Sequence, residues 1–184
     1  MELIHGQTLE DRGQADDRVI EKVGKAIRYM HERTRDYDCR PGPVCGGRAQ
    51  GFPWGEDCVE EEFGTLDDLE VCINRRLLAD PKSRGPLKFE KQDCTLFHGD
   101  LNPRNIIVND QNEIAFLDWA TACYYPPMFE VAALYSHQSR ALPEQRSFFD
   151  KLIARLQEYV DRSKEDMSRL ERVHVLSIQR SFSK

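Results

Sequence analysis

Two short apolar runs near the middle of the chain constrain its fold more than any other feature. Residues 105–108 (NIIV) and 114–117 (IAFL) are separated by the polar residues NDQNE. Turn-forming residues between two apolar runs are typical of a β-hairpin. Asn105 stands where the first run begins, and Asp118 directly follows the second. Because a tight hairpin brings its two open ends side by side, Asn105 and Asp118 are expected to be neighbours.

The turn-rich segment before the hairpin supplies a further carboxylate. The stretch FHGDLNPRNIIV, residues 97–108, places Asp100 shortly before Asn105. An amide oxygen and a carboxylate can share a hard cation, and Mg²⁺ prefers oxygen ligands. If Asn105 and Asp118 held the ion, Asp100 could accept a proton from a hydroxyl that attacks a phosphate. The segment therefore predicts the lower half of a phosphoryl-transfer site. The alternative is an ordinary Asx-rich turn before a hairpin.

The spacing of these residues resembles the catalytic loop of kinase-like enzymes. That loop reads H-x-D-x-x-x-x-N and is followed by a metal-binding aspartate after a hairpin. Here HGDLNPRN is followed by LDW. The glycine after the histidine, and LDW in place of DFG, are similar to the aminoglycoside phosphotransferase and choline kinase family in its fungal type. The segment YYPPMFEVAAL and the start MELIHGQTLED also resemble that family, so the resemblance covers nearly the whole chain.

The resemblance implies a role for each polar residue of this segment. Asp100 corresponds to the catalytic base, and Asn105 and Asp118 correspond to ligands of a Mg²⁺ ion that accompanies ATP. His98 would mainly hold the loop in place. The residues implied to contact the adenine of ATP are Glu2, Leu3, Ile4, Ile107 and Leu117. Taken alone, the last two are equally consistent with plain core. The phosphoryl acceptor would be a small molecule with a hydroxyl group.

The remainder of the chain predicts mainly helices. Candidate helix starts are Asp16, Thr65 with Asp68 as its capping-box partner, Phe129, Pro143 and Lys164. Residues 36–64 show no periodicity and are expected to form an irregular insert, which the resemblance puts near the acceptor pocket. The fold class is therefore predicted as α+β and predominantly helical. Residues 1–184 would form one protein-kinase-like C-terminal lobe, with the catalytic loop and metal hairpin at residues 98–118.

The resemblance also implies a second lobe that these 184 residues are not expected to contain. Residues 1–6 would be a remnant of the linker between the lobes, and no lysine precedes Lys22. The N-terminal lobe covers the phosphates and grips them with a lysine. Since phosphoryl transfer depends on positioning and charge stabilisation, a truncated kinase of low activity on its own is expected. The alternative is a non-catalytic, pseudokinase-like module that binds a ligand in the remnant cleft.

Composition narrows the expected partners. A net charge of -6 without a basic stripe argues against nucleic-acid binding. No apolar run approaches the ~18 residues of a membrane span, and no secretory signal is present, so a cytoplasmic protein is expected. The six cysteines lack zinc-site spacing and are expected to be free thiols, although a Cys39–Cys45 bridge is conceivable. Acidic residues at positions 56, 57 and 60–62 either attract a cationic acceptor or form a solvated face.

Overall fold

The computed structural model describes residues 4–13, 16–35, 39–55, 61–83, 85–89 and 93–181. Glu2, Leu3 and the acidic positions 56, 57 and 60 lie outside these described residues. Within them, the chain forms six α-helices and two small antiparallel sheets. None of the described helices is both long enough and apolar enough to cross a bilayer.

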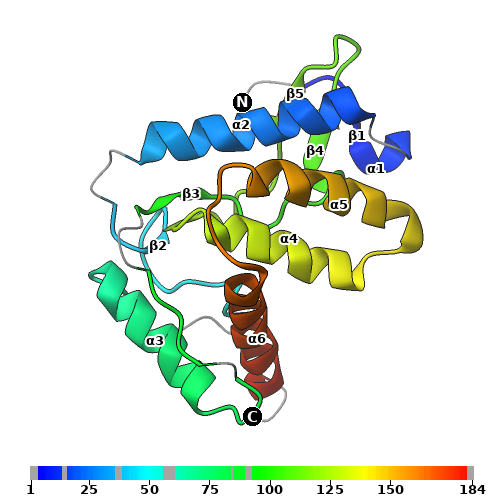
Figure 1. Cartoon of the computed structure of the whole chain (residues 1–184). Coiled ribbons are helices and arrows are strands. Elements are labelled where there is room, and N and C mark those ends of the chain that lie inside the picture. The colour runs from blue at the N-terminus through cyan, green and yellow to red at the C-terminus, as the bar shows by residue number, and fades with distance from the viewer. Residues whose placement is uncertain are drawn as a thin grey trace.

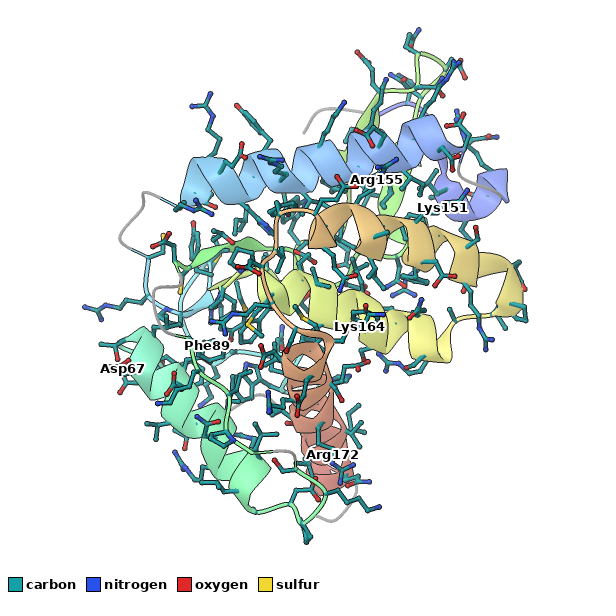
Figure 2. The ribbon with its side chains drawn as sticks, in the orientation of Figure 1. Asp67, Phe89, Lys151, Arg155, Lys164 and Arg172 are labelled. Atoms are coloured by element: carbon teal, nitrogen blue, oxygen red, sulfur yellow. The ribbon has the colours of Figure 1, made fainter. Side chains whose placement is uncertain are left out.

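The helices pack in two groups (Figure 1). A long helix, α2, lies above α5 and α4, while α3 and α6 pair below them. The bounds are α1 Leu9–Arg12, α2 Asp17–Thr34, α3 Leu66–Leu78, α4 Met128–Arg140, α5 Pro143–Gln157 and α6 Lys164–Ser181. Figure 2 shows Lys151 and Arg155 on the side of α5 that faces α2. Lys151 pairs there with Asp17 at 2.6 Å, and Arg155 with Glu21 at 3.1 Å.

The helix starts agree with the sequence prediction, and their caps explain why. The Asp16 carboxylate accepts the Val19 N–H at 2.8 Å, which satisfies a free donor at the start of α2. Thr65 and Asp68 form the predicted capping box of α3. Pro143 stands in the first turn of α5, where its missing N–H costs nothing. Local sequence signals therefore fix these boundaries.

The predicted hairpin is present and forms two of the three strands of the first sheet. Strands β4 (Ile106–Val108) and β5 (Ile114–Phe116) pair antiparallel, with Ile106 opposite Phe116. Strand β1 (Gln7–Thr8) pairs on the other side of β4. Strand β1 begins directly after Gly6. A Cβ on Gly6 would lie 2.5 Å from the Ile107 side chain, so glycine lets the chain pass close to β4.

A second sheet corrects the prediction that residues 36–64 are wholly irregular. Strand β2 (Gly42–Pro43) belongs to this segment and pairs with β6 (Cys123–Tyr125), which in turn pairs with β3 (Thr95–Phe97). Strands of two or three residues are too short to show a period of two, so the sequence pattern could not reveal them. The insert is thus joined to the chain that enters and leaves the hairpin region.

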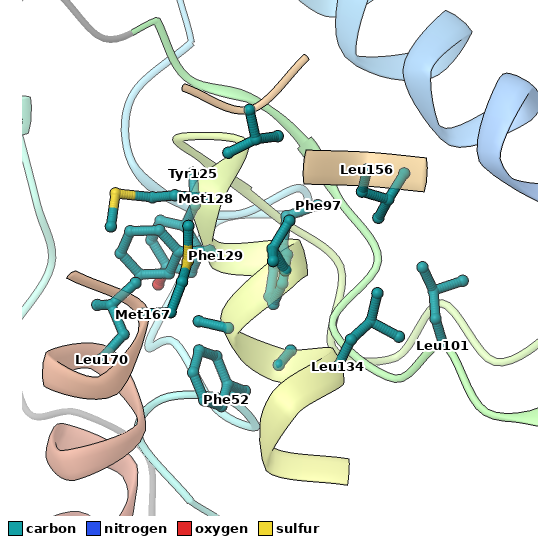
Figure 3. Close-up of a cluster of buried hydrophobic side chains, with 14 of the residues drawn as sticks. Phe52, Phe97, Leu101, Tyr125, Met128, Phe129, Leu134, Leu156, Met167 and Leu170 are labelled. Carbon is teal, nitrogen blue, oxygen red and sulfur yellow. The ribbon is translucent and has the colours of Figure 1, made fainter. Parts of the chain in front are cut away.

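Aromatic residues of the insert and of the segment before α4 share one core. Figure 3 shows Phe97, Tyr125 and Phe129 gathered beside α4. The rings of Tyr125 and Phe129 stack with centroids 4.6 Å apart, and the buried Trp54 Nε1 donates to the Tyr125 hydroxyl at 2.9 Å. Phe52, Trp54 and Phe63 of the insert are buried. Five cysteines among the described residues are free thiols.

The buried His31 of α2 is expected to make the stability of the fold depend on pH. The ring of His31 lies 2.9 Å from the Tyr159 hydroxyl, and burial lowers the pKa of His31 to about 4. The unfolded chain, with the ordinary pKa of 6.5, binds the proton first as the pH falls. Stability is therefore lost between pH 6.5 and 4, and the His31 share is on the order of 2 kcal/mol at pH 4.5.

The variant His31→Asn tests this share, because the asparagine amide can still bond to Tyr159. Urea unfolding at pH 7.5 and pH 4.5 is expected to give a smaller loss of unfolding free energy in the variant than in the unmodified chain. Equal losses in the two proteins would show that His31 does not carry this pH dependence.

Candidate active site

The segment from His98 to Asp100 is held from behind by a buried glutamate. Glu130 on α4 has no exposed surface, and its two carboxylate oxygens accept the N–H groups of His98 at 2.8 Å and Gly99 at 3.2 Å. Burial raises the pKa of Glu130 to about 7, while the two donors oppose that change. Gly99 has φ of +83° and would bring a Cβ within 2.8 Å of the Phe97 ring. Glycine is therefore required at this turn.

His98 is fixed as a neutral ring. Its Nε2 donates to the Leu117 carbonyl at 2.9 Å, and its Nδ1 accepts the Asp100 N–H at 3.3 Å. Each ring nitrogen thus has one role, which leaves no place for a second proton. Burial lowers the pKa of His98, in agreement with the neutral form. The ring lies 4.5 Å from the Trp119 ring and links the loop to the end of the hairpin, the structural role expected from the sequence.

Asp100 projects from this loop and is partly buried. Its Oδ2 accepts Nη2 of Arg104 at 2.9 Å and Nδ2 of Asn105 at 2.8 Å. Its Oδ1 accepts Nδ2 of Asn102 and, at 3.3 Å, the same guanidinium group. On its other side, Nε2 of His137 lies 3.4 Å from Oδ1. The carboxylate is therefore surrounded by hydrogen-bond donors from its own loop, with the His137 ring of α4 beside it.

The position of Asn105 leaves its amide oxygen available to a cation. The Nδ2 group of Asn105 donates to both the carbonyl and the carboxylate of Asp100. The carbonyl and carboxylate oxygens of Asp100 can only accept hydrogen bonds, so the nitrogen of the Asn105 amide must be the atom that faces them. The Oδ1 atom, on the other arm of the planar amide, must then point away from Asp100. Asn105 also accepts the Leu117 N–H at 2.8 Å through its carbonyl, which continues the hairpin to the residue before Asp118.

Asp118 stands at the open end of the hairpin in an unusual backbone conformation. It is exposed and has φ of +60°, a left-handed region that residues other than glycine seldom occupy. Such strain often occurs at functional sites, where the surrounding structure holds it. The conformation turns the chain sharply between β5 and the exposed Trp119. The structure thus brings the chain at Asp118 next to Asn105, as the hairpin predicted.

The oxygen ligands at the hairpin end fit a Mg²⁺ ion that also binds phosphate and water. They are too few for a metal ion held by protein side chains alone. An asparagine oxygen and an aspartate carboxylate are hard oxygen ligands, and Mg²⁺ commonly takes one or two such groups together with water and substrate phosphates. Among the residues that the structure describes, no three His, Cys, Asp or Glu side chains gather into a metal site. The residues present therefore fit an ion that arrives with a phosphate compound.

A groove of about 890 Å³ runs along the exposed face of the first sheet. Its lining includes Ile4 and Ile107, two of the residues implied to contact adenine. Leu117 does not line this groove, and its carbonyl binds the His98 ring instead. Ile107 is only partly buried, which is consistent with a surface that a ligand could cover. Glu2 and Leu3 lie outside the described part of the chain.

The acidic residues of the insert lie partly within the described chain. Glu61 pairs with Arg75 at 2.8 Å and accepts from the Cys72 thiol at 3.4 Å. Its charge is therefore largely matched inside this chain. Glu62 is exposed. These contacts favour a solvated face for the described part of the acidic run.

Sequence reasoning missed two residues of α4 that contact the segment from His98 to Asp100. Neither Glu130 nor His137 was among the predicted site residues. Burial lowers the pKa of His137 to about 4, so its ring is neutral beside Asp100. Glu130 carried a signal, because it is a charged residue within the apolar run MFEVAAL, where a carboxylate must find buried partners. No signal of this kind in the sequence pointed to His137.

Among comparisons with known proteins, a family profile shows the family and solved structures show the fold. The profile of the phosphotransferase enzyme family, APH, matches residues 1–170. A comparison with curated proteins gave no match. A thermostable mutant of aminoglycoside phosphotransferase APH(4)-Ia, in a ternary complex with ADP and hygromycin B, has a TM-score of 0.52 at 15% identity, over 97% of this chain and 64% of that chain.

Two further solved structures are similar. The apo form of a thermostable APH(4)-Ia mutant has a TM-score of 0.52 at 15% identity, over 99% of this chain and 66% of that chain. The choline kinase LicA from Streptococcus pneumoniae has a TM-score of 0.43 at 14% identity, over 95% of this chain and 67% of that chain. The chain thus spans slightly less than two thirds of the APH(4)-Ia structures, and the likeness to them shows a kinase-like fold.

Proposed function

This chain belongs to the phosphotransferase enzyme family, and we propose that it takes part in transferring the γ-phosphoryl group of ATP to a hydroxyl group of a small molecule. The observation that carries the proposal is the contact of Asn105 with Asp100 on one side and with the residue before Asp118 on the other. Under this proposal, the contact would bring the base close to one metal ligand and to the part of the chain that carries the other. The kinase-like fold supports the same function.

In the proposed reaction, Asp100 acts as the base. The acceptor oxygen forms a bond to the γ-phosphorus while the bond from that phosphorus to the bridging oxygen breaks. The electron pair of the broken bond stays with ADP, and the proton of the acceptor hydroxyl passes to the Asp100 carboxylate. The buried Glu130 and the neutral His98 ring hold the loop, so that Asp100 does not have to reorganise.

Asn105 and Asp118 would hold the Mg²⁺ ion through Oδ1 and the carboxylate. When bound, the ion would neutralise charge on the nucleotide phosphates. We assign the catalytic loop and metal hairpin to residues 98–118, and the adenine to the face of the sheet at Ile4 and Ile107. Residues 1–6 would link this lobe to a phosphate-gripping lobe, with Glu2 and Leu3 against the adenine edge. Leu117 would contribute to the floor from the end of the hairpin.

The acceptor is proposed only as a small hydroxyl compound. APH(4)-Ia was solved with hygromycin B and ADP bound, and LicA is a choline kinase. One form of this proposal is a positively charged acceptor, which Glu62 and the other acidic residues of the insert would attract. The ion pair of Glu61 with Arg75 does not add to that case.

A second candidate function is ligand binding without transfer. One observation favours it, because both oxygens of Asp100 are already occupied by donors from the same loop. A base that stays covered cannot accept a proton. The two candidates agree on nucleotide binding and differ in whether a phosphoryl group moves.

An assay with ATP labelled at the γ-phosphate separates the two candidates. The chain would be incubated with Mg²⁺, labelled ATP and a set of acceptors that includes an aminoglycoside and choline. Slow, Mg²⁺-dependent transfer of label to an acceptor is expected. If ATP binds but no label moves to any hydroxyl compound, the transfer function is wrong for this chain and the binding function takes its place.

A further inference from the structure

Arg104 covers the solvent side of the proposed base. Its Nη2 group lies 2.9 Å from Oδ2 and 3.3 Å from Oδ1 of Asp100, so one guanidinium group bridges both carboxylate oxygens. The Arg104 side chain is 57% exposed, compared with 21% for Asp100. Arg104 is therefore the more solvent-exposed member of this pair.

The hydrogen-bond capacity of Asp100 is fully used in this arrangement. A carboxylate accepts about four hydrogen bonds, two at each oxygen. Oδ1 receives Asn102 and Arg104, and Oδ2 receives Arg104 and Asn105. A hydroxyl that is to lose its proton to Asp100 needs one of these positions. At least one donor must therefore leave before transfer.

Arg104 is the donor that can leave. Asn102 and Asn105 are buried, with 8% and 6% exposure, and Asn105 is held by a second bond to the Asp100 carbonyl at 2.9 Å. His137 faces Asp100 from α4, but its ring is neutral because burial lowers its pKa to about 4. Arg104 is therefore the charged partner of Asp100 among the described residues that contact it, and it is the one in solvent.

We propose that Arg104 moves from Asp100 to the γ-phosphoryl group when ATP binds, an inference that rests on the proposed function. The acceptor hydroxyl takes the vacated position on Asp100, and the guanidinium group donates to phosphoryl oxygens. A planar guanidinium fork matches a phosphate as well as it matches a carboxylate. The movement is short, because the hydroxyl that bonds to Asp100 is the one that attacks the γ-phosphorus.

The exchange also balances charge during transfer. As Asp100 takes the proton of the hydroxyl, it loses the negative charge that attracted Arg104. Negative charge at the same moment spreads over the phosphoryl oxygens and the leaving ADP oxygen. Arg104 would thus uncover the base and stabilise the transferred group in one movement.

Nucleotide binding provides a test that does not depend on turnover. Calorimetry on the full chain would compare Mg²⁺ complexes of ADP and of a non-hydrolysable ATP analogue. Arg104→Ala is expected to lower the affinity for the ATP analogue by about tenfold or more, since charged hydrogen bonds are lost, and to leave the affinity for ADP unchanged. Arg104→Lys should retain part of the preference. The exposed Arg18, changed to alanine, is the matched control and should alter neither affinity.

Each other outcome identifies which idea has failed. An unchanged ratio of the two affinities in Arg104→Ala overturns the inference about Arg104 and leaves the proposed function intact. Equal losses for ADP and the ATP analogue also overturn it, because they indicate a structural role in holding the loop. No binding of either nucleotide by the unmodified chain overturns the proposed function itself, together with the inference.

Discussion

Asp100→Asn is expected to slow transfer of the γ-phosphoryl group by about 10²–10⁴-fold, the usual contribution of a general base. An amide cannot take the proton of the acceptor hydroxyl. The affinity for the Mg²⁺ complex of ATP should change little, because Asn105 and Asp118 rather than Asp100 are the proposed ligands. The measurement is release of labelled γ-phosphate to an acceptor in a single turnover, together with calorimetric titration of the same samples.

Asp161→Asn is the matched control for this change. Asp161 is an exposed aspartate between α5 and α6, away from the loop that carries Asp100 and from the groove along the first sheet. This variant should transfer label at the rate of the unmodified chain. If Asp100→Asn transferred label as fast as Asp161→Asn, the carboxylate of Asp100 could not be the base. Thermal unfolding of both variants checks that the amide at position 100 has not loosened the loop.

Glu130→Ala is expected to lower the unfolding free energy by about 2–5 kcal/mol at pH 5. The change leaves the N–H groups of His98 and Gly99 without acceptors in a buried place, at roughly 1–3 kcal/mol each. Loss of the buried side chain adds to this cost. The same change should abolish phosphoryl transfer, because the turn that presents Asp100 is no longer held.

The effect of Glu130→Ala should depend on pH in a defined direction. The pKa of Glu130 in the folded chain is about 7, above its ordinary value of 4.5. The folded state therefore holds the proton more tightly, and its stabilising effect is complete below pH 4.5 and lost as the pH rises through 7.

Urea unfolding should show a larger loss of unfolding free energy for Glu130→Ala at pH 5 than at pH 8. The exposed Glu144, changed to alanine, should show a small loss at both values. If the loss of unfolding free energy caused by Glu130→Ala instead grew as the pH rose, the raised pKa of the buried Glu130 carboxylate would be contradicted.

Local signals in the sequence were sufficient for helices α2 to α6 and for the hairpin, whereas the short helix α1 was not predicted. The caps at Asp16 and Thr65 act within one turn of helix, and the β4–β5 pairing needs only two apolar runs and a turn between them. The second sheet was not predicted, because β2 and β3 are far from each other in sequence and both pair with β6. Pairing of such short strands is set by the tertiary fold, and their residues carry no clear pattern.

The candidate site could be predicted where its contacts are local. The contact of Asn105 with Asp100 lies within one loop, and its proximity to Asp118 follows from the hairpin. The support from Glu130 and His137 on α4 depends on packing between distant segments. The bond of Arg104 to Asp100 joins residues one helical turn apart in sequence, but only the three-dimensional structure shows that it uses the last free positions on the carboxylate.

The most direct test of the central claim is calorimetric titration of the unmodified chain with ATP, in the presence of Mg²⁺ and in the presence of a chelator. Binding that requires Mg²⁺ is predicted, and Asp118→Ala should weaken it by at least about tenfold, since loss of outer partners alone commonly costs that much. Absence of ATP binding, or binding that is equal with chelator and in Asp118→Ala, would contradict the assignment of Asn105 and Asp118 as the Mg²⁺ site of a phosphotransferase.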